Sequence, residues 1–231
     1  MNVLIANYGN ASLAMIQWAI ETKLDKVVVL SVDTGWQSSH WQTHLTHVFN
    51  FLENKGIAFQ HLNSQKTFEE CVIDRGSFPS KKFQWCASFL KGLPLNDALD
   101  VLDIHCKATL HLAKMRVTSR ANQSLLSGEI SEHYQDRALN YPLLADSFEE
   151  RDALIKRAGF DVMAHNSQEC MPCIHADKSD WQRMSAIDVE RLTSLQTNIN
   201  QKMFIEPLSN KANDNTQHYD MGCGNVWGCG E

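Results

Sequence analysis

The chain has 231 residues, 43% of them hydrophobic, and its 21 basic and 27 acidic side chains give a formal charge of −6. This length and apolar content suit one globular domain of ordinary α/β size, with or without a small appendage. The acidic balance excludes a global attraction to nucleic acid and favours a small molecule or a protein as partner, although Lys81, Lys82 and Lys91 could form a local basic patch.

The first residues, MNVLIANYG, lack the basic segment, long apolar stretch and cleavage site of a secretory signal peptide. No apolar run is long enough to cross a bilayer. Seven cysteines, an odd number, do not suit a disulfide framework. We therefore expect a cytoplasmic protein with no membrane partner, in which Cys170 and Cys173 bind a metal or are redox-active.

Two units of strand, loop and helix are predicted at the start of the chain. The apolar run at residues 3–6 precedes a turn and a helical pattern that starts near Ser12. A β-branched run at residues 26–36 precedes an amphipathic helix that stops at Gly56. This alternation predicts an α/β fold with a doubly wound parallel sheet, whose ligands bind beyond the carboxyl ends of the strands.

The middle of the chain is expected to be mainly helical. Residues 94–114 have a helical pattern, and residues 115–120 suggest a strand. A helix is predicted after Ser147, with Glu150 completing a capping box and Gly159 ending the helix. Residues 177–200 form another strongly helical stretch.

The composition becomes polar near residue 207. Residues 1–206 are therefore predicted to form the domain, and residues 207–231 a polar linker with a tail rich in glycine and cysteine. Such a tail cannot pack a core, because glycine has no apolar side chain and loses much backbone entropy on ordering. Its cysteines, Cys223 and Cys229, are thus either without a role or the functional part of the tail.

The turn ANYGNAS, residues 6–12, ends a strand and opens a helix, so its N–H groups and helix dipole suit an anion such as phosphate. Further motifs follow at residues 32–36 (VDTGW), 78–95 (FPSKKFQWCASFLKGLPL), 119–124 (SRANQS) and 170–173 (CMPC). In this order they resemble the phosphoadenosine phosphosulfate (PAPS) reductase family of the PP-loop, adenine-nucleotide α-hydrolase-like superfamily, over roughly residues 1–190.

The resemblance implies a sheet that binds an adenine nucleotide, such as PAPS, adenosine phosphosulfate or ATP, over its carboxyl edge. We expect Trp36 to stack on the base. The residues implied for the nucleotide are Asn7, Tyr8, Gly9, Asn10, Ala11, Ser12, Asp33, Thr34, Gly35 and Trp36, with Lys91 and Arg120 neutralising charge.

The loop differs from that of ATP-cleaving members of the superfamily, which carry Ser-Gly-Gly-x-Asp-Ser. Here residues 7–12 read Asn-Tyr-Gly-Asn-Ala-Ser, so Ala11 replaces the acidic residue. The loop is therefore less suited to Mg-dependent cleavage of ATP, and in this respect it resembles the reductases. In those enzymes a cysteine thiolate attacks the sulfonate sulfur, and a second thiol, for example from a thioredoxin-like donor, reduces the S-sulfocysteine.

The family's nucleophile sits in a C-terminal Glu-Cys-Gly-Leu-His tail, and this chain ends Gly-Cys-Gly-Glu. The resemblance implies Cys229 as nucleophile and Cys223 as a partner thiol, although the family's Glu and His are missing. A thiolate nucleophile needs a lowered pKa. Because the tail has no cation of its own, the cation must come from the body of the protein.

Some sulfonucleotide reductases hold a [4Fe-4S] cluster on a Cys-Cys pair and a Cys-x-x-Cys pair. Cys86, Cys170 and Cys173 match three of those ligands, and Trp85 stands in place of the other. Three thiolates favour an iron–sulfur cluster or zinc. The resemblance leaves the remaining ligand open between Cys223, Cys229, His175 and an exogenous group.

Other residues of the same types are expected to be structural. Cys71 and Cys106 lie in apolar, helical patterns and are expected in the core. His40, His44 and His47 follow one helix face, which we expect to be solvated and not a metal site.

These features predict a sulfonucleotide reductase that releases sulfite. One alternative is an iron–sulfur-dependent sulfurtransferase that cleaves ATP and acts on a nucleotide, tRNA or DNA, and only this alternative involves nucleic acid. Another is a non-catalytic protein that binds a nucleotide or docks a partner. The sequence leaves open the nucleotide, the metal and whether a homo-oligomer forms.

Overall fold

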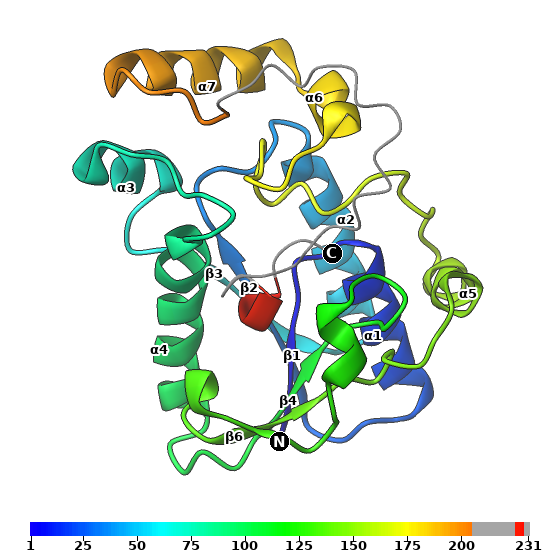
Figure 1. Ribbon diagram of the computed structural model, residues 1–231. Coiled ribbons are helices and arrows are strands. Elements are labelled where there is room, and N and C mark those ends of the chain that lie inside the picture. The colour runs from blue at the N-terminus through cyan, green and yellow to red at the C-terminus, as the bar shows by residue number, and fades with distance from the viewer. Residues whose placement is uncertain (205–224, 229–231) are drawn as a thin grey trace.

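The computed structural model describes residues 1–204 and 225–228. At its centre lies a six-stranded sheet in the order β3-β2-β1-β4-β6-β5, in which β5 runs antiparallel to β6 and the other pairs are parallel (Figure 1). The order reverses between β1 and β4, which confirms the predicted doubly wound α/β fold. The strands are β1 (Asn2–Ile5), β2 (Val27–Asp33), β3 (Ala58–Asn63), β4 (Thr109–Leu112), β5 (Ile130–Ser131) and β6 (Arg137–Asn140).

Helices cover both faces of this sheet. None of the helices within the described residues is long and apolar enough to span a membrane. The α-helices are α1 (Asn10–Glu21), α2 (Trp41–Asn54), α3 (Phe68–Arg75), α4 (Leu93–Leu102), α5 (Phe148–Ala158), α6 (Lys178–Arg183) and α7 (Ala186–Asn198). A π-helical segment, η1 (Ala87–Gly92), leads into α4, and short 3-10 turns occur at η2 (Ala121–Ser124), η3 (Glu132–Tyr134) and η4 (Asn225–Trp227).

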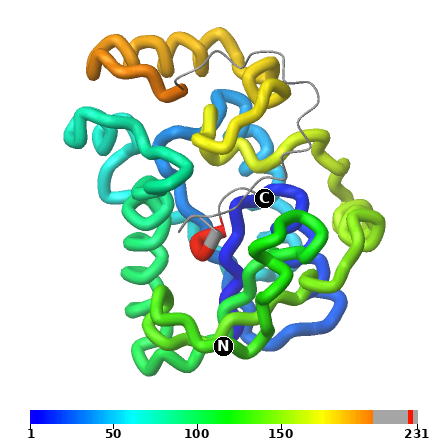
Figure 2. The backbone as a smooth tube through the Cα atoms, in the orientation of Figure 1, coloured from blue at the N-terminus to red at the C-terminus, as the bar shows by residue number. Residues whose placement is uncertain are grey.

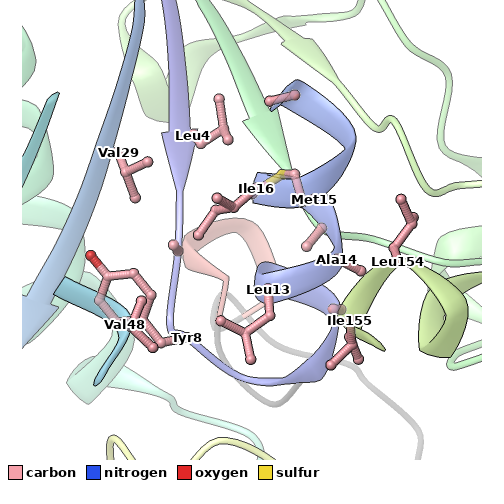
Figure 3. Packing of buried hydrophobic residues seen from close by; sticks show 14 of the residues in the cluster. Leu4, Tyr8, Leu13, Ala14, Met15, Ile16, Val29, Val48, Leu154 and Ile155 are labelled. Atoms are coloured by element: carbon pink, nitrogen blue, oxygen red, sulfur yellow. The ribbon is translucent and has the colours of Figure 1, made fainter. Parts of the chain in front are cut away.

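Helix α1 is buried on two sides, between the sheet and α5. Figure 3 shows its side chains lying between strand residues Leu4 and Val29 and the α5 residues Leu154 and Ile155. A helix that packs against neighbours on both sides is apolar around most of its circumference. This explains the run of consecutive buried residues Leu13, Ala14, Met15 and Ile16.

A separate hydrophobic cluster lies beyond the carboxyl ends of the strands. It contains Trp36, Phe68 of α3, Trp85 and Leu192 of α7, all buried. Figures 1 and 2 show α3 and α7 side by side at this end of the molecule. The cluster joins segments that follow different strands and so forms a cap over the edge where ligands bind in such sheets.

The predicted helix over residues 94–114 is wrong in its second half. Helix α4 ends at Leu102, and residues 109–112 form β4 in the middle of the sheet. The backbone leaves the helical conformation at Asp103, whose carboxylate accepts hydrogen bonds from the N–H groups of Lys107 and Ala108 in the turn that leads to β4. A short strand buried on both faces has no period-2 polarity, so its pattern was mistaken for a helix. The strand predicted at residues 115–120 is a loop instead.

Local capping signals were read more accurately. Ser147 and Glu150 form the predicted capping box, and Gly159 adopts the left-handed conformation that ends α5. The helical stretch at residues 177–200 divides into α6 and α7, because Ser185 begins a new helix with its own capping box. Cys106 is exposed in the turn before β4, contrary to the expected core position.

His111 connects three neighbouring strands. Its Nε2 lies 3.0 Å from Asn2 Oδ1 on β1, and its Nδ1 lies 3.0 Å from Asn140 Nδ2 on β6. With these partners Nε2 donates and Nδ1 accepts, which is the pattern of a neutral imidazole. Burial lowers the pKa of His111 to about 4.

We expect the free energy of unfolding to fall as the pH decreases from 6.5 towards 4. In this window the unfolded chain binds a proton at His111 that the native protein excludes, so the stability present above pH 6.5 is lost. Urea unfolding of His111→Gln at pH 7 and pH 5 should show a smaller pH dependence than the wild type. The exposed control His105→Gln should keep the wild-type dependence, and an equal dependence in His111→Gln would contradict the assignment.

Candidate functional site

A cavity of about 370 Å³ lies beyond the carboxyl ends of the strands. Its wall includes Asn10 and Ala11 after β1, Thr34 after β2 and Lys114 after β4. The strand order reverses between β1 and β4, and doubly wound sheets bind ligands in the crevice at such a reversal. The volume is also within the range of small-molecule sites, about 300–1,000 Å³.

Three of the predicted metal ligands line this one cavity. Cys86 has a helical conformation directly before η1, and Cys170 and Cys173 come from the segment before α6, with His175 beside them. Their thiols would suit a soft metal. However, within residues 1–204 and 225–228 no three His, Cys, Asp or Glu side chains are grouped closely enough to hold a metal ion. The described residues therefore do not form a complete metal site by themselves.

The loop after β1 is organised by the side chain of Asn7. Asn7 Oδ1 accepts hydrogen bonds from the Gly9 N–H and from Ser12 Oγ, both at 2.9 Å, and Ser12 Oγ accepts the Asn7 N–H at 3.1 Å. Leu13 is the first residue whose N–H bonds back to the Gly9 carbonyl. The N–H groups of residues 10–12 precede that bond and belong to the first helical turn, so they have no acceptor within the helix.

Tyr8 contributes its backbone and not its side chain to this loop. Its φ of +57° turns the chain, and its ring is directed into the core, where the hydroxyl accepts a hydrogen bond from Ser31 Oγ (Figure 3). Burial raises the pKa of Tyr8 to about 12. Tyr8 was predicted to bind the nucleotide, and the structure instead makes its side chain part of the hydrophobic core.

Neighbouring elements brace the loop from outside. Asn10 exchanges two hydrogen bonds with the Met163 backbone, at 2.8 and 2.9 Å, and Ser167 Oγ donates to the Asn7 carbonyl. His44 Nε2 lies 2.9 Å from the Tyr8 carbonyl, and burial lowers the pKa of this imidazole. We had predicted that His44 lies on a solvated helix face. The structure instead places it half-buried against the loop, which it supports through this contact.

The loop after β2 contributes one residue directly to the cavity wall. Thr34 lines the cavity, and its Oγ1 donates to the Glu169 carbonyl at 3.1 Å and lies 3.4 Å from Cys170 Sγ. Asp33 Oδ1 accepts the Gly35 N–H at 2.8 Å and faces a much smaller pocket of about 10 Å³. The structure thus separates Asp33 from Thr34, although both were predicted to line the nucleotide site.

Trp36 does not present a ring face for a base to stack on. Its indole is fully buried, stacked on Phe68 at a centroid distance of 4.8 Å, with the Arg191 guanidinium 4.1 Å from the ring. Its Nε1 donates to the Pro172 carbonyl, and its own carbonyl accepts the Met171 N–H. Trp36 therefore anchors the Cys170–Cys173 segment, which corrects its predicted role as a stacking partner.

Lys91, which we predicted would neutralise charge on a ligand, lines the cavity and is buried in an ion pair. Its Nζ donates to Glu169 Oε1 at 2.8 Å, and both residues are less than 10% exposed. Burial raises the pKa of Glu169, and the Lys91 ammonium opposes this rise. Glu169 was not predicted as a site residue, although an acidic residue directly before Cys170 was a visible signal.

Two other cationic side chains, Arg120 and Lys114, lie differently with respect to the cavity. Arg120 is exposed just before η2, next to Ser119, which lines the cavity. Lys114 is only 2% exposed and lines the cavity directly after β4. Lys114 was not predicted as a site residue, because residues 109–112 were assigned to a helix. As a strand, these residues would have placed Lys114 at the ligand-binding edge.

The short η4 segment of the tail packs against the domain, next to the cavity. The Trp227 ring is buried against Gly92 and lies 4.8 Å from the Tyr134 ring, while the Tyr134 hydroxyl donates to the Val226 carbonyl. Figure 1 shows this segment in red between α4 and the sheet. The tail therefore does contribute to the core, contrary to our prediction, because Trp227 supplies the apolar surface that glycine lacks.

The carbonyl of Gly228 accepts hydrogen bonds from Asn7 Nδ2 at 3.1 Å and from Lys91 Nζ at 3.3 Å. The segment that precedes Cys229 in the sequence is thus bonded to the loop after β1 and to η1. Cys223 and Cys229, the predicted partner thiol and nucleophile, lie outside the described residues.

We expect Gly92→Ala to loosen residues 225–228. An added Cβ would lie 2.7 Å from Trp227 Cε2, whereas the backbone conformation at Gly92 suits alanine. Overpacking of this kind costs about 1–3 kcal/mol. Hydrogen exchange should therefore be faster in the peptide that contains Trp227. Because the effect requires the indole, Gly92→Ala in a Trp227→Ala background should add nothing, and an added effect there would refute the contact.

Comparison with known proteins defines the fold. No protein-family model and no curated protein sequence matches the chain. Among solved structures it is similar to an NMN synthetase from Francisella tularensis, with a TM-score of 0.51 and 13% identity over 89% of this chain and 88% of that one.

Two further structures are similar at a TM-score of 0.46. One is the U34-tRNA thiolase NcsA from Methanococcus maripaludis with its [4Fe-4S] cluster, at 14% identity over 85% of this chain and 66% of that one, just under two thirds of its length. The other is an NH3-dependent NAD synthetase from Campylobacter jejuni, at 13% identity over 86% of this chain and 74% of that one. At these identities the likeness concerns the fold alone, and the chain has the adenine-nucleotide α-hydrolase-like fold.

Proposed function

We propose that the protein binds an adenine nucleotide in the 370 Å³ cavity and reduces a sulfonucleotide by thiol chemistry, with release of sulfite. The observation that carries this proposal is the composition of the cavity wall. The start of α1, the buried Lys114 and three cysteines, Cys86, Cys170 and Cys173, surround one space at the reversal of the strand order.

In this proposal the first turn of α1 receives the anionic part of the nucleotide. Backbone N–H groups at a helix start, together with the helix dipole, favour phosphate or sulfonate oxygens. The loop that supplies them is held by Asn7, Asn10 and Ser12, so little ordering is needed when the ligand binds. Lys114 adds a positive charge that the low polarity of its buried position strengthens.

The chemical step requires two thiols. The Cys229 thiolate attacks the sulfonate sulfur, a sulfur–sulfur bond forms, and the bond from sulfur to the bridging phosphate oxygen breaks, with the electron pair leaving on the nucleotide. A second thiolate, from Cys223 or a thioredoxin-like dithiol, then attacks Sγ of Cys229. Sulfite leaves as a disulfide forms, so the two electrons that reduce the sulfur come from the two thiols.

The cysteines of the cavity wall also favour a second candidate, a sulfurtransferase. It would activate its substrate by cleaving ATP to AMP and pyrophosphate. The side chain of Ala11 in the cavity wall provides no carboxylate for the magnesium ion that such cleavage uses. Pyrophosphate production from ATP, without sulfite release from a sulfonucleotide, would favour this candidate over the reductase. Nucleotide binding without either product would favour a non-catalytic role.

An iron–sulfur cluster or zinc ion remains part of the proposal. Cys170 and Cys173 would be two of its ligands, with Cys86 beside them and further donors from Cys223 or Cys229. When bound, a cluster would supply electron storage or charge near the nucleotide. The thiol step above does not depend on it.

Lys114→Met should weaken the binding of adenosine phosphosulfate by about 10- to 100-fold, the effect of losing one hydrogen bond to a charged group. Uncharged adenosine should bind the variant and the wild type almost equally, because it carries no anion. Calorimetric titration measures both affinities. Lys107→Met, at an exposed position before the amino end of β4, is the matched control. Equal loss for both ligands would mean that Lys114 is structural.

Cys229→Ser should abolish sulfite release and the S-sulfocysteine intermediate, because a serine hydroxyl is not a nucleophile of comparable strength at neutral pH. Mass spectrometry of the intact protein detects the added sulfonate. Cys106→Ser, changed at an exposed turn before the amino end of β4, is the matched control and should behave as the wild type.

Iron, sulfide and zinc should be measured in the same proteins after anaerobic purification, together with Cys86→Ser, Cys170→Ser and Cys173→Ser. Loss of metal in these variants is the result expected for a metal site. Unchanged metal in all of them would end the cluster proposal, and full sulfite release by Cys229→Ser would end the nucleophile assignment.

A further inference from the structure

The buried ammonium group of Lys91 connects three segments, each of which lies next to a cysteine in the sequence. Lys91 lies on η1, five residues after Cys86. Its Nζ donates to Glu169, which directly precedes Cys170, and to the carbonyl of Gly228, which directly precedes Cys229. One side chain thus connects segments that are 78 and 137 residues away along the chain.

The carboxylate partner of this ammonium is itself held in place. The Glu169 backbone carbonyl accepts a hydrogen bond from Thr34 Oγ1, and the Glu169 N–H donates to Ser167 Oγ. Glu169 is 9% exposed and Lys91 is 3% exposed. A buried pair of this kind has little freedom, because separating its members would leave a charge without a partner in a poorly solvating environment.

The Lys91 ammonium also donates to a neutral backbone acceptor, the Gly228 carbonyl, at 3.3 Å. Asn7 Nδ2 donates to the same Gly228 oxygen, so two buried side chains fix the position of a single carbonyl.

We propose that Lys91, paired with Glu169, is a positioning residue that fixes the Gly228 carbonyl and so holds residues 225–228 against the domain. The chemical role of the Cys229 thiol depends on the proposed function. The position of residues 225–228 does not depend on it and is measured separately.

The test compares the wild type with Lys91→Met/Glu169→Gln, which removes both charges and leaves neither partner buried alone. Hydrogen exchange reports on the peptide that contains Trp227, and peptide mass spectrometry follows the alkylation rate of Cys229 by iodoacetamide. The exposed Cys106 serves as the internal reference. No nucleotide is added, so these readouts do not depend on the proposed reaction.

We expect the double variant to exchange faster at residues 225–228 and to change the Cys229 alkylation rate by about tenfold, consistent with loss of one hydrogen bond from a charged donor. Lys91→Arg keeps a cationic donor and should restore part of the wild-type behaviour. Because Lys91 and Glu169 also line the cavity, the affinity of each variant for adenosine phosphosulfate is measured separately by calorimetry.

Unchanged exchange and unchanged alkylation in the double variant would overturn the proposal. A large loss of nucleotide affinity with normal tail behaviour would instead assign Lys91 to the ligand, as the sequence had suggested, and would also overturn it. The two proposals fail independently. If Cys229→Ser still releases sulfite while the tail measurements respond as expected, the reductase assignment falls and the positioning role stands.

Discussion

The reversal of strand order between β1 and β4 is the constraint on which the candidate site depends. Crossovers that leave neighbouring strands in opposite directions cannot cover the gap between the strand ends, so a crevice remains there. The first turn of α1 and the ammonium of Lys114 reach this crevice from the two sides of the reversal. A pair of adjacent strands therefore creates the space, and the loops that follow them supply its chemical character.

The cap over this crevice gives Trp36 its structural importance. The buried indole packs against Phe68 and bonds to the backbone next to Cys170 and Cys173, while Cys86 and Cys170 contact the same cluster. Hydrophobic packing thus carries the cysteine-bearing segments to the cavity. The ion pair of Lys91 and Glu169 adds a directional polar link between these segments, which non-directional apolar contacts cannot provide.

Features that depend on neighbouring residues were predictable from the sequence. The capping box of Ser147 and Glu150 and the end of α5 at Gly159 involve residues a few positions apart, so the local pattern contains the necessary information. The first two strands were also found, because β-branched runs precede clear helical patterns. By contrast, β4 is a four-residue strand buried on both faces, and its apolar pattern does not distinguish strand from helix. Lys114 was lost from the predicted site with it.

The sequence by itself determined the fold class and the position of the loop after β1, whereas the roles of the cysteines stay predictions. Only the tertiary structure decided which of these groups share a cavity, because the contacts between Lys91, Glu169 and Gly228 join residues that are 78 and 137 positions apart. It also decided that Tyr8 and Trp36 belong to packed cores and that Trp227 docks beside the cavity. The physical reason is that burial and pairing depend on the neighbours that folding brings together, and periodicity along a chain does not record them.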